Sequence, residues 1–323
     1  MPEQSPSPKR RGRLLRFGAA VVVLCAVAGY LVVQYVTGAG TPGCKVVSAK
    51  GGGAAYEFTP EQAVNAATIA AVGTGRGMPE RAVTIALATA IQESGLRNLD
   101  HGDRDSLGLF QQRPSQGWGT PKEIMDPTYS ANLFYEHLAK VRDYTRLPLT
   151  VAAQRVQRSG FPTAYAKHEP DATLLAAALT GESAATLTCA GRRTATQAAG
   201  PDAVRSALAR DFGRDVLEPA AAEVGGATTP TPTPSADEGD GRTVTLPVTA
   251  DTASDGGRGL RQRGWQLAHW AVANASALHI ERVSYAGWEW TAGNTDSQWR
   301  RVGARAAGGA EKDADAVRIV TGR

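Results

Sequence analysis

The strings IQESGL at residues 91–96 and SLGLFQ at residues 106–111 decide the expected fold of this 323-residue chain. The first string ends a segment that begins at Pro79 and Glu80 and carries apolar residues at helical spacing. That spacing predicts a helix with one stripe facing a core. The second string is an apolar burst that follows a loop rich in Gly, Asp and Arg. Glu93 is therefore expected at the end of an apolar helix, facing the Gly-Leu-Phe segment.

Helical patterns continue on both sides of these strings. Residues 59–62 read TPEQ, with Thr as the N-cap, Pro at the first helical position and Gln three residues after the cap. This arrangement is typical of a helix start. Further helices are expected at 127–143, 149–158 and 171–185. Residues 56–190 are therefore expected to form one mainly helical domain.

The N-terminal part has the pattern of a membrane anchor. Residues 17–36 form an apolar run of the length, about 20 residues, that crosses a bilayer. Positive charge lies only before this run, so residues 1–16 are expected in the cytoplasm and the bulk of the chain outside the cell. A cleaved signal peptide is the alternative. Residues 37–55, rich in Gly and Thr, are expected to be a flexible spacer.

Charge gives no sign of a nucleic-acid partner. The formal net charge is +4, and the basic residues that produce this excess crowd into residues 9–16. Nucleic-acid binding would need a basic face on the folded part. We therefore expect none.

Cys44 and Cys189 are the cysteines that follow the expected anchor. An even number outside the cell favours a disulfide, which would tie together the two ends of the helical domain. Two unpaired thiols are the alternative. The five His and these two Cys form no close ligand set, so neither a metal nor a cofactor is expected.

The last part of the chain is expected to hold a linker and a second module. Residues 191–241 are expected to be the linker. Its first part, 191–222, is Ala- and Arg-rich and is expected to form one exposed helix, and the Thr-Pro repeats that follow cannot pack a core. Residues 242–323 contain five of the six tryptophans, which argues for a packed module. Helical spacing over 265–278 and strand patterns near 280–285 and 317–320 favour a small α+β fold.

Residues 91–96 and 106–111 together resemble the soluble lytic transglycosylase and goose-type lysozyme families of the lysozyme-like superfamily. The family pattern is Glu-Ser at the end of a helix, followed further on by Gly-Leu-Met/Phe-Gln. The resemblance covers roughly 60–165 and implies a lysozyme-like fold, peptidoglycan as substrate and Glu93 as the acid that protonates the glycosidic oxygen. It also implies a supporting hydroxyl on Ser94. The residues implied to line the sugar groove are Gly108, Leu109, Phe110 and Gln111.

The chain departs from the family pattern in two places. Residues 130–131 read SA where the family usually has Asn-Ile. Residues 156–159 read VQRS and are the nearest counterpart of a Tyr-Asn-Ala-Gly string in the family. These departures leave the details of substrate recognition open.

Elementary chemistry supports an acid role for Glu93 beside the resemblance. A glycosidase acid must stay protonated near neutral pH, which requires a pKa raised by partial burial, and a helix C-terminus raises it further. A hydrolase would also need a second carboxylate. Asp103 and Asp105 could supply it, but we favour solvated loop acids paired with Arg97 and Arg104. Lytic transglycosylases need only one carboxylate, because the muramyl 6-hydroxyl attacks the anomeric carbon and forms a 1,6-anhydro product.

Two aromatic side chains have alternative roles. Trp118 offers a flat apolar face to a sugar, and loop packing explains it equally well. Tyr165 could reach the cleft, and core packing is the favoured role. The C-terminal segment resembles a small domain at the ends of actinobacterial cell-wall-associated proteins, which implies a cell-envelope partner of unknown kind.

The expected function is cleavage of peptidoglycan strands, and the alternative is a non-catalytic wall-binding or scaffold protein.

Overall fold

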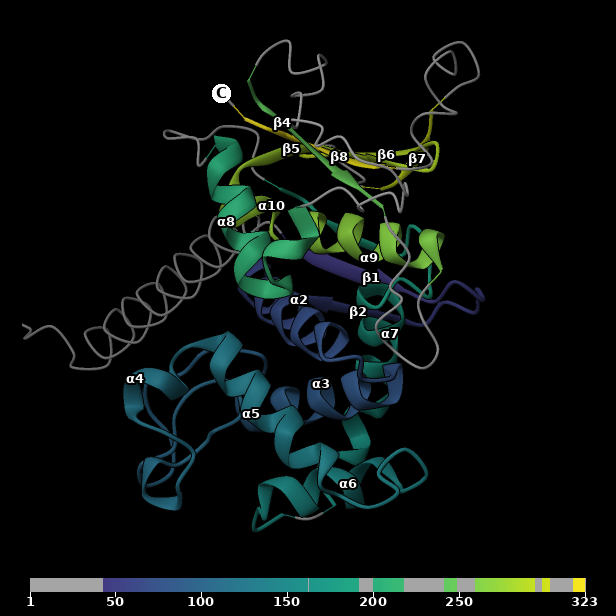
Figure 1. Cartoon of the computed structure of the whole chain (residues 1–323). Helices are drawn as coiled ribbons and strands as arrows, with labels where there is room; N and C mark the ends of the chain where they lie inside the picture. The colour runs from purple at the N-terminus through teal and green to yellow at the C-terminus, as the bar shows by residue number, and fades with distance from the viewer. Residues whose placement is uncertain are drawn as a thin grey trace, which may run out of the picture. The chain divides into compact units, whose positions relative to one another are not determined.

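The computed structural model describes residues 43–161, 163–191, 200–217, 241–248, 259–293, 298–302 and 316–322. About half of it is helical, and it contains two small antiparallel sheets (Figure 1). The expected basic tail at 1–16 and the expected anchor at 17–36 lie outside the described residues. Among the described helices, none combines the length and the apolar character needed to cross a bilayer.

The smaller sheet joins the two ends of the helical segment. Its strands are β1 (Cys44–Val47), β2 (Ala55–Phe58) and β3 (Leu187–Cys189), in the order β2-β1-β3. Cys44 lies opposite Cys189 in the pairing of β1 with β3, and the two form a disulfide. The expected disulfide is therefore present. The expected spacer at 37–55 is wrong over β1, because Cys44 and Val46 are buried. Only the loop of residues 48–54, which contains the glycines at 51–53, separates the two strands.

The helices of the segment begin near the predicted positions, but the helices expected at 127–143 and 171–185 end earlier, at Ala139 and Leu179. Thr59 caps α2 (Pro60–Gly75): its hydroxyl accepts from the Gln62 N–H, and the Gln62 side chain accepts from the Thr59 N–H. The expected capping box is thus confirmed. The other helices of this part are α3 (Glu80–Ser94), α4 (Pro121–Ile124), α5 (Pro127–Ala139), α6 (Leu149–Gln157) and α7 (Glu169–Leu179), with short 3-10 turns at Pro114–Gln116 and Ala166–His168.

The helix α3 is central and is buried on every side. Every residue from 82 to 91 is buried, so the expected single stripe understates its burial. Alanine and threonine fill much of this stretch, and small side chains let neighbouring helices approach on all faces. The threonine hydroxyls need no outside partner, because Thr84 and Thr89 donate to Glu80 O and Ile85 O one turn back. A helix buried in this way places its C-terminal Glu93 firmly.

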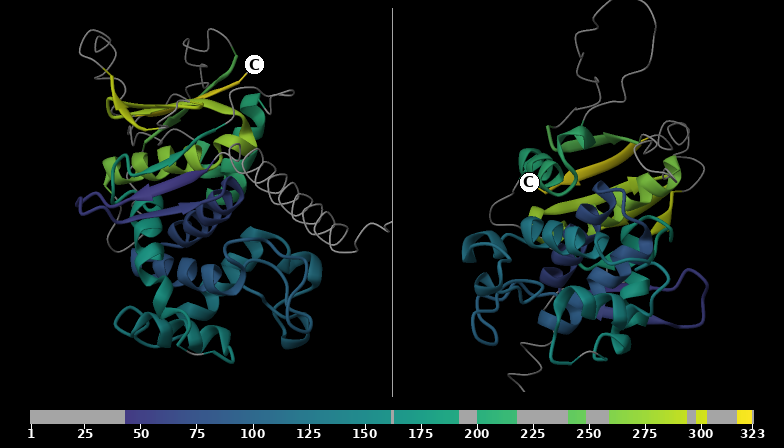
Figure 2. Two further views of the ribbon diagram at one scale, coloured as in Figure 1. Left: turned by 180° about the vertical axis from the view of Figure 1, so that it is seen from behind. Right: turned by 60° about the horizontal axis from the view of Figure 1, so that its bottom comes forward.

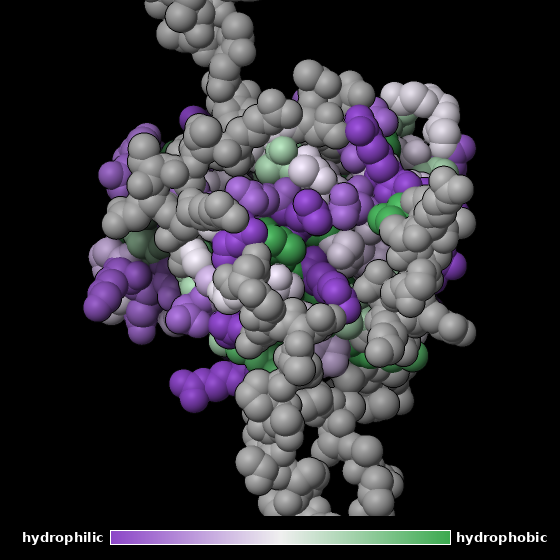
Figure 3. Space-filling view, turned by 90° about the horizontal axis from the view of Figure 1, so that it is seen from above, coloured by the Kyte–Doolittle hydropathy of each residue, from purple (hydrophilic) through white to green (hydrophobic). Residues whose placement is uncertain are grey.

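The larger sheet lies in the C-terminal part. Its strands are β4 (Thr243–Pro247), β5 (Ile280–Tyr285), β6 (Trp288–Thr291), β7 (Arg300–Arg301) and β8 (Ala316–Thr321), in the order β4-β8-β5-β6-β7. The expected strand at 280–285 is confirmed. One face of the sheet packs on α9 (Leu260–Ala273), which is followed by α10 (Ala275–Leu278). The other face is largely hydrophilic where it is described (Figure 3).

The C-terminal part is packed against the rest of residues 42–323, which form one compact unit. The helix α9 lies between the large sheet and the layer that contains α2 and β1 (Figures 1 and 2). Buried tryptophans join the two: Trp290 Nε1 donates to Cys189 O at 3.2 Å, and Trp299 Nε1 donates to Leu187 O at 2.9 Å. The α+β character of 242–323 is seen, but these residues are not a separate module, because their rings fill a shared core.

Part of the expected linker at 191–241 is also folded. Residues 200–212 form α8 (Gly200–Phe212), and a 3-10 turn follows at Arg214–Leu217. Asp211 of α8 is buried and accepts hydrogen bonds from Thr68 Oγ1 at 3.2 Å and from Trp270 Nε1 at 2.8 Å. The expected helix is therefore present, but it is not simply exposed, because Val204, Ala207 and Leu208 are buried against the rest of the fold. The Thr-Pro repeats lie outside the described residues.

Candidate active site

Glu93 occupies the last turn of α3, and Gly95 ends the helix in the left-handed conformation with φ of 62°. The Glu93 side chain is half-buried, and this burial raises its pKa above the ordinary value of 4.5. Hydrogen bonds from Tyr165 and Gln157 oppose the shift without cancelling it. Desolvation at the end of an apolar helix therefore favours the protonated, proton-donating form.

Tyr165 is the closest partner of Glu93. Its ring is fully buried, and its hydroxyl donates to Glu93 Oε1 at 2.6 Å. Burial, and then the contact with Glu93, raise the pKa of this phenol, so it stays a neutral donor. The expectation of core packing was correct for its ring and missed its hydroxyl. Tyr135 is different, because its buried hydroxyl donates to a backbone oxygen, Ile69 O at 3.0 Å, and so has only a structural role.

Gln157 links Glu93 to the second string. It is the last residue of α6, and its amide Nε2 donates to Phe110 O at 2.7 Å. It also acts on Glu93 as a hydrogen-bond donor. Residues 156–159, the nearest counterpart of the family's Tyr-Asn-Ala-Gly string, therefore reach the site through the amide side chain of Gln157.

Ser94 positions the second string. Its buried hydroxyl donates to Ala90 O at 3.0 Å and to Leu109 O at 2.8 Å. It holds the turn of residues 107–112 against the end of α3. Its role in the structure is thus support for the loop, with no exposed hydroxyl for a ligand.

The expected groove residues separate into two groups. The side chains of Leu109 and Phe110 are fully buried, and the Phe110 ring stacks on Phe134 at 4.6 Å between centroids. They cannot line a groove with their side chains, because an apolar turn beside α3 is pulled into the core. Gln111 is half-buried and lies in the left-handed region with φ of 47°.

Gly108 is required by its surroundings. Its φ is 75°, and a Cβ there would lie 2.7 Å from Ile124 O. Its N–H donates to Leu99 O at 2.7 Å, which pins the string to the preceding loop. Glycine is the residue that tolerates both the backbone conformation and the close approach.

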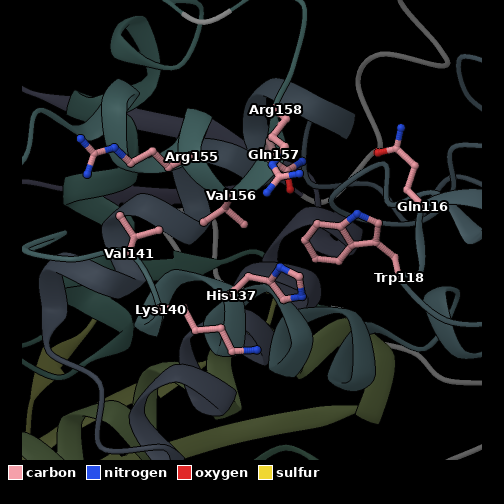
Figure 4. Close-up of a pocket in the computed structure, with 9 residues that line it drawn as sticks. All are labelled: Gln116, Trp118, His137, Lys140, Val141, Arg155, Val156, Gln157 and Arg158. Carbon is pink, nitrogen blue, oxygen red and sulfur yellow. The ribbon is translucent and has the colours of Figure 1, made fainter.

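A pocket of about 320 Å³ adjoins this cluster (Figure 4). Trp118 is half-buried at its wall and stacks on His137 with ring centroids 4.4 Å apart. Gln157 lines the same pocket and also bonds to Glu93, which is not itself one of the lining residues. The complete lining is Gln116, Trp118, His137, Lys140, Val141, Arg155, Val156, Gln157 and Arg158.

Asp103 is solvated as expected, whereas Asp105 has a partner other than the expected ones. Asp105 pairs with Arg113 Nε at 2.8 Å and accepts from the Ser115 N–H at 2.8 Å, and these contacts lower its pKa strongly. The expected partners, Arg97 and Arg104, do not hold it: Arg97 Nε donates to Ser94 O at 3.3 Å. Asp103 is exposed, and among the described contacts only its backbone carbonyl is engaged.

Within the described ranges, no group of three or more His, Cys, Asp or Glu side chains is arranged to hold a metal ion. The site therefore consists of one half-buried carboxyl, a phenol and an amide that bond to it, and an adjoining pocket. Comparison with models of protein families and with characterised proteins finds no match to this chain.

Proposed function

We propose that this protein cleaves the glycan strands of peptidoglycan, with Glu93 as general acid in a lysozyme-like domain. The observation that carries the proposal is the setting of Glu93. Burial raises the pKa of this carboxyl, a buried helix ends at it, and it bonds to Gln157, which lines a pocket. A carboxyl kept protonated near neutral pH by desolvation is what glycosidic cleavage requires.

In the proposed reaction, Glu93 gives its proton to the glycosidic oxygen as the bond from that oxygen to the anomeric carbon breaks. The 6-hydroxyl of the same muramic acid then attacks the anomeric carbon, and the Glu93 carboxylate takes the hydroxyl proton. The glycosidic bond is replaced by a 1,6-anhydro ring, and Glu93 is protonated again. One carboxylate suffices for this sequence.

The state of Asp105 favours this single-carboxylate reaction over hydrolysis. A hydrolase would use a second carboxylate to activate water or to attack. Asp105 is instead engaged by Arg113 and by the Ser115 N–H, which lower its basicity. We therefore propose lytic transglycosylation, with Trp118 and Gln157 contributing contacts to the sugar.

We also propose that the chain is anchored by residues 17–36 and that its folded part lies outside the cell membrane. The disulfide between Cys44 and Cys189 supports this placement, because disulfides persist in oxidising compartments. The substrate of the proposed reaction is in the same compartment.

The test is product analysis with the full-length protein and purified peptidoglycan. We expect soluble fragments that end in 1,6-anhydromuramic acid, identified by mass spectrometry. Fragments with reducing ends would show hydrolysis instead of lytic transglycosylation. Asp103 and Asp105 would then again be candidates for the second carboxylate. Binding of the glycan without any fragments would overturn the enzymatic proposal in favour of a wall-binding protein.

Tyr165→Phe should move the alkaline limb of the pH profile of kcat/KM to higher pH. The Tyr165 hydroxyl bonds to the Glu93 carboxyl and lowers its pKa, so removing it raises that pKa further. A general acid is active only while protonated, and activity falls as pH rises through its pKa. A higher pKa therefore preserves activity to higher pH.

Tyr135→Phe is the matched control for this shift. It also removes a buried tyrosine hydroxyl, one that bonds to Ile69 O and has no contact with Glu93. Both variants should lose about 1 kcal/mol of stability, and only Tyr165→Phe should displace the limb. An unchanged limb, or one moved to lower pH, would contradict the assignment of Glu93 as the acid that Tyr165 tunes.

A further inference from the structure

The pocket that Gln157 and Trp118 line is positively charged. Three basic side chains line it, Lys140, Arg155 and Arg158, and no acidic side chain does. Lys140 is paired with Glu136 at 2.7 Å. Across the described part of the chain, neither Arg155 nor Arg158 has a carboxylate within ion-pair distance. Two guanidinium groups are therefore available to an anion.

The lowered pKa of His137 reflects the positive charge of the pocket. Burial lowers its pKa, and the charges of Lys140 and Arg158 lower it further, with only Glu136 opposing. The imidazole is thus favoured in its neutral form, stacked on Trp118. Figure 4 shows these two rings side by side at the pocket, with Gln157 and Arg158 facing them.

Arg158 is linked to the proposed reacting centre through its neighbour in the chain, Gln157. It follows Gln157, which acts directly on Glu93, and Val156, which also lines the pocket. Arg158 ends α6 in the left-handed conformation with φ of 51°, which turns the chain at this point. An anion held here would lie one residue away from a side chain that contacts the catalytic carboxyl.

The size and the neutral groups of the pocket indicate what the anion belongs to. About 320 Å³ is far more than one carboxylate fills and is within the range of small-ligand sites. Gln116 and Gln157 offer amide groups, which can pair with peptide bonds. Arginine is the side chain best suited to bind a carboxylate through two parallel hydrogen bonds. These features fit a short peptide that carries carboxylates.

We infer that this pocket binds the carboxylate-bearing peptide stem attached to muramic acid, so that strands still carrying their peptides are the preferred substrate. The inference rests on the proposed function, since it places the stem of the same substrate beside the bond that Glu93 would cleave. Arg158 is the principal anion-binding residue, and Arg155 adds charge.

The test measures binding rather than turnover, with the full-length Glu93→Gln protein and isothermal titration calorimetry. The probes are an N-acetylglucosamine–muramic acid disaccharide that carries a tetrapeptide and the same disaccharide with a free lactyl carboxylate. We expect the first to bind about two- to fivefold more tightly, which is the magnitude of a well-oriented ion pair at an exposed site. Raising the salt concentration should reduce the preference.

Arg158→Gln, added to the same protein, should abolish most of the preference. Arg261→Gln is the matched control: Arg261 is exposed on α9, does not line the pocket, and its replacement changes net charge equally. It should retain the preference. The inference would be overturned if the Arg158→Gln variant kept the preference for the tetrapeptide probe. It would also be overturned if both probes bound equally to the parent protein, because the pocket would then bind the lactyl carboxylate instead of the peptide.

The outcomes separate this inference from the proposed function. If the wild-type protein cuts no strands but the preference for the tetrapeptide probe depends on Arg158, the pocket assignment holds and the enzymatic proposal fails. If strands are cut but neither probe is preferred, the pocket assignment fails and the enzymatic proposal holds.

Discussion

Glu93→Gln lowers the rate of strand cleavage by about 100-fold or more, with products read as anhydromuropeptides by mass spectrometry. General acid catalysis contributes roughly 100- to 10,000-fold in enzymes that use it. Glutamine keeps the size of the side chain and removes the transferable proton. Its amide oxygen can still accept from the Tyr165 hydroxyl, so the local packing is preserved.

The same substitution should leave the fold intact or stabilise it. Burial raises the pKa of Glu93 above 4.5, which means that the ionised carboxylate destabilises the folded state at higher pH. A neutral glutamine removes that cost. A rate loss together with an unchanged or higher melting temperature would therefore assign the loss to chemistry, whereas a lowered melting temperature would leave the assignment unsupported.

Glu80→Gln is the matched control for this experiment. Glu80 lies at the first turn of the same helix, is half-buried, and also has a pKa raised by burial. It therefore shares the chemical character of Glu93 but lies at the opposite end of the helix, away from Tyr165 and Gln157. Cleavage at the wild-type rate by Glu80→Gln is expected. An equal loss in both variants would remove Glu93 from its proposed role.

Local sequence signals predicted the secondary structure of the chain well. The capping box at Thr59 and the strand Ile280–Tyr285 depend on residues a few positions apart, and the structure has both. The burial of α3 on all sides was underestimated, because its alanines and threonines give a weak apolar stripe while allowing close packing. Spacing along one helix does not report how many neighbours surround it.

The candidate site shows where sequence reasoning stops. Glu93 was singled out by a motif, but its partners Gln157 and Tyr165 lie 64 and 72 positions away in the chain, as their numbers give. Only the packing of α6 and the following loop against α3 brings them together. Leu109 and Phe110 were assigned to the groove by the same motif, and their apolar side chains are instead drawn into the core.

The pairing of β1 with β3 was also beyond local signals. Each strand is only three or four residues long, and a glycine-rich turn follows β1. The cysteines alone marked the connection, because their even number predicted a link across the whole helical segment. That link has a consequence for stability that is larger than that of any single contact in the site.

Replacing both Cys44 and Cys189 by alanine should lower the free energy of unfolding by about 5 kcal/mol. The disulfide closes a loop with a sequence separation of 145 residues. In the chain-entropy description, the stabilisation by a crosslink grows with loop length and reaches about 5 kcal/mol at this size. Urea unfolding followed by tryptophan fluorescence would measure the difference, with Cys25→Ala as a control that changes a cysteine but keeps the crosslink.

The loss should appear in stability before it appears in catalysis. The closed loop contains Glu93, Gln157 and Tyr165, so the crosslink restrains all three in the unfolded chain. In the folded chain their contacts come from the packing of α3 and α6, which the crosslink does not touch. The alanine variant should therefore cut glycan at the wild-type rate well below its unfolding temperature and lose activity at a lower temperature. If the alanine variant unfolded at the same urea concentration as the wild-type protein, the strand pairing of β1 with β3 would suffice without the covalent bond. If the variant cleaved glycan slowly even at low temperature, the disulfide would be needed for the geometry of the site itself.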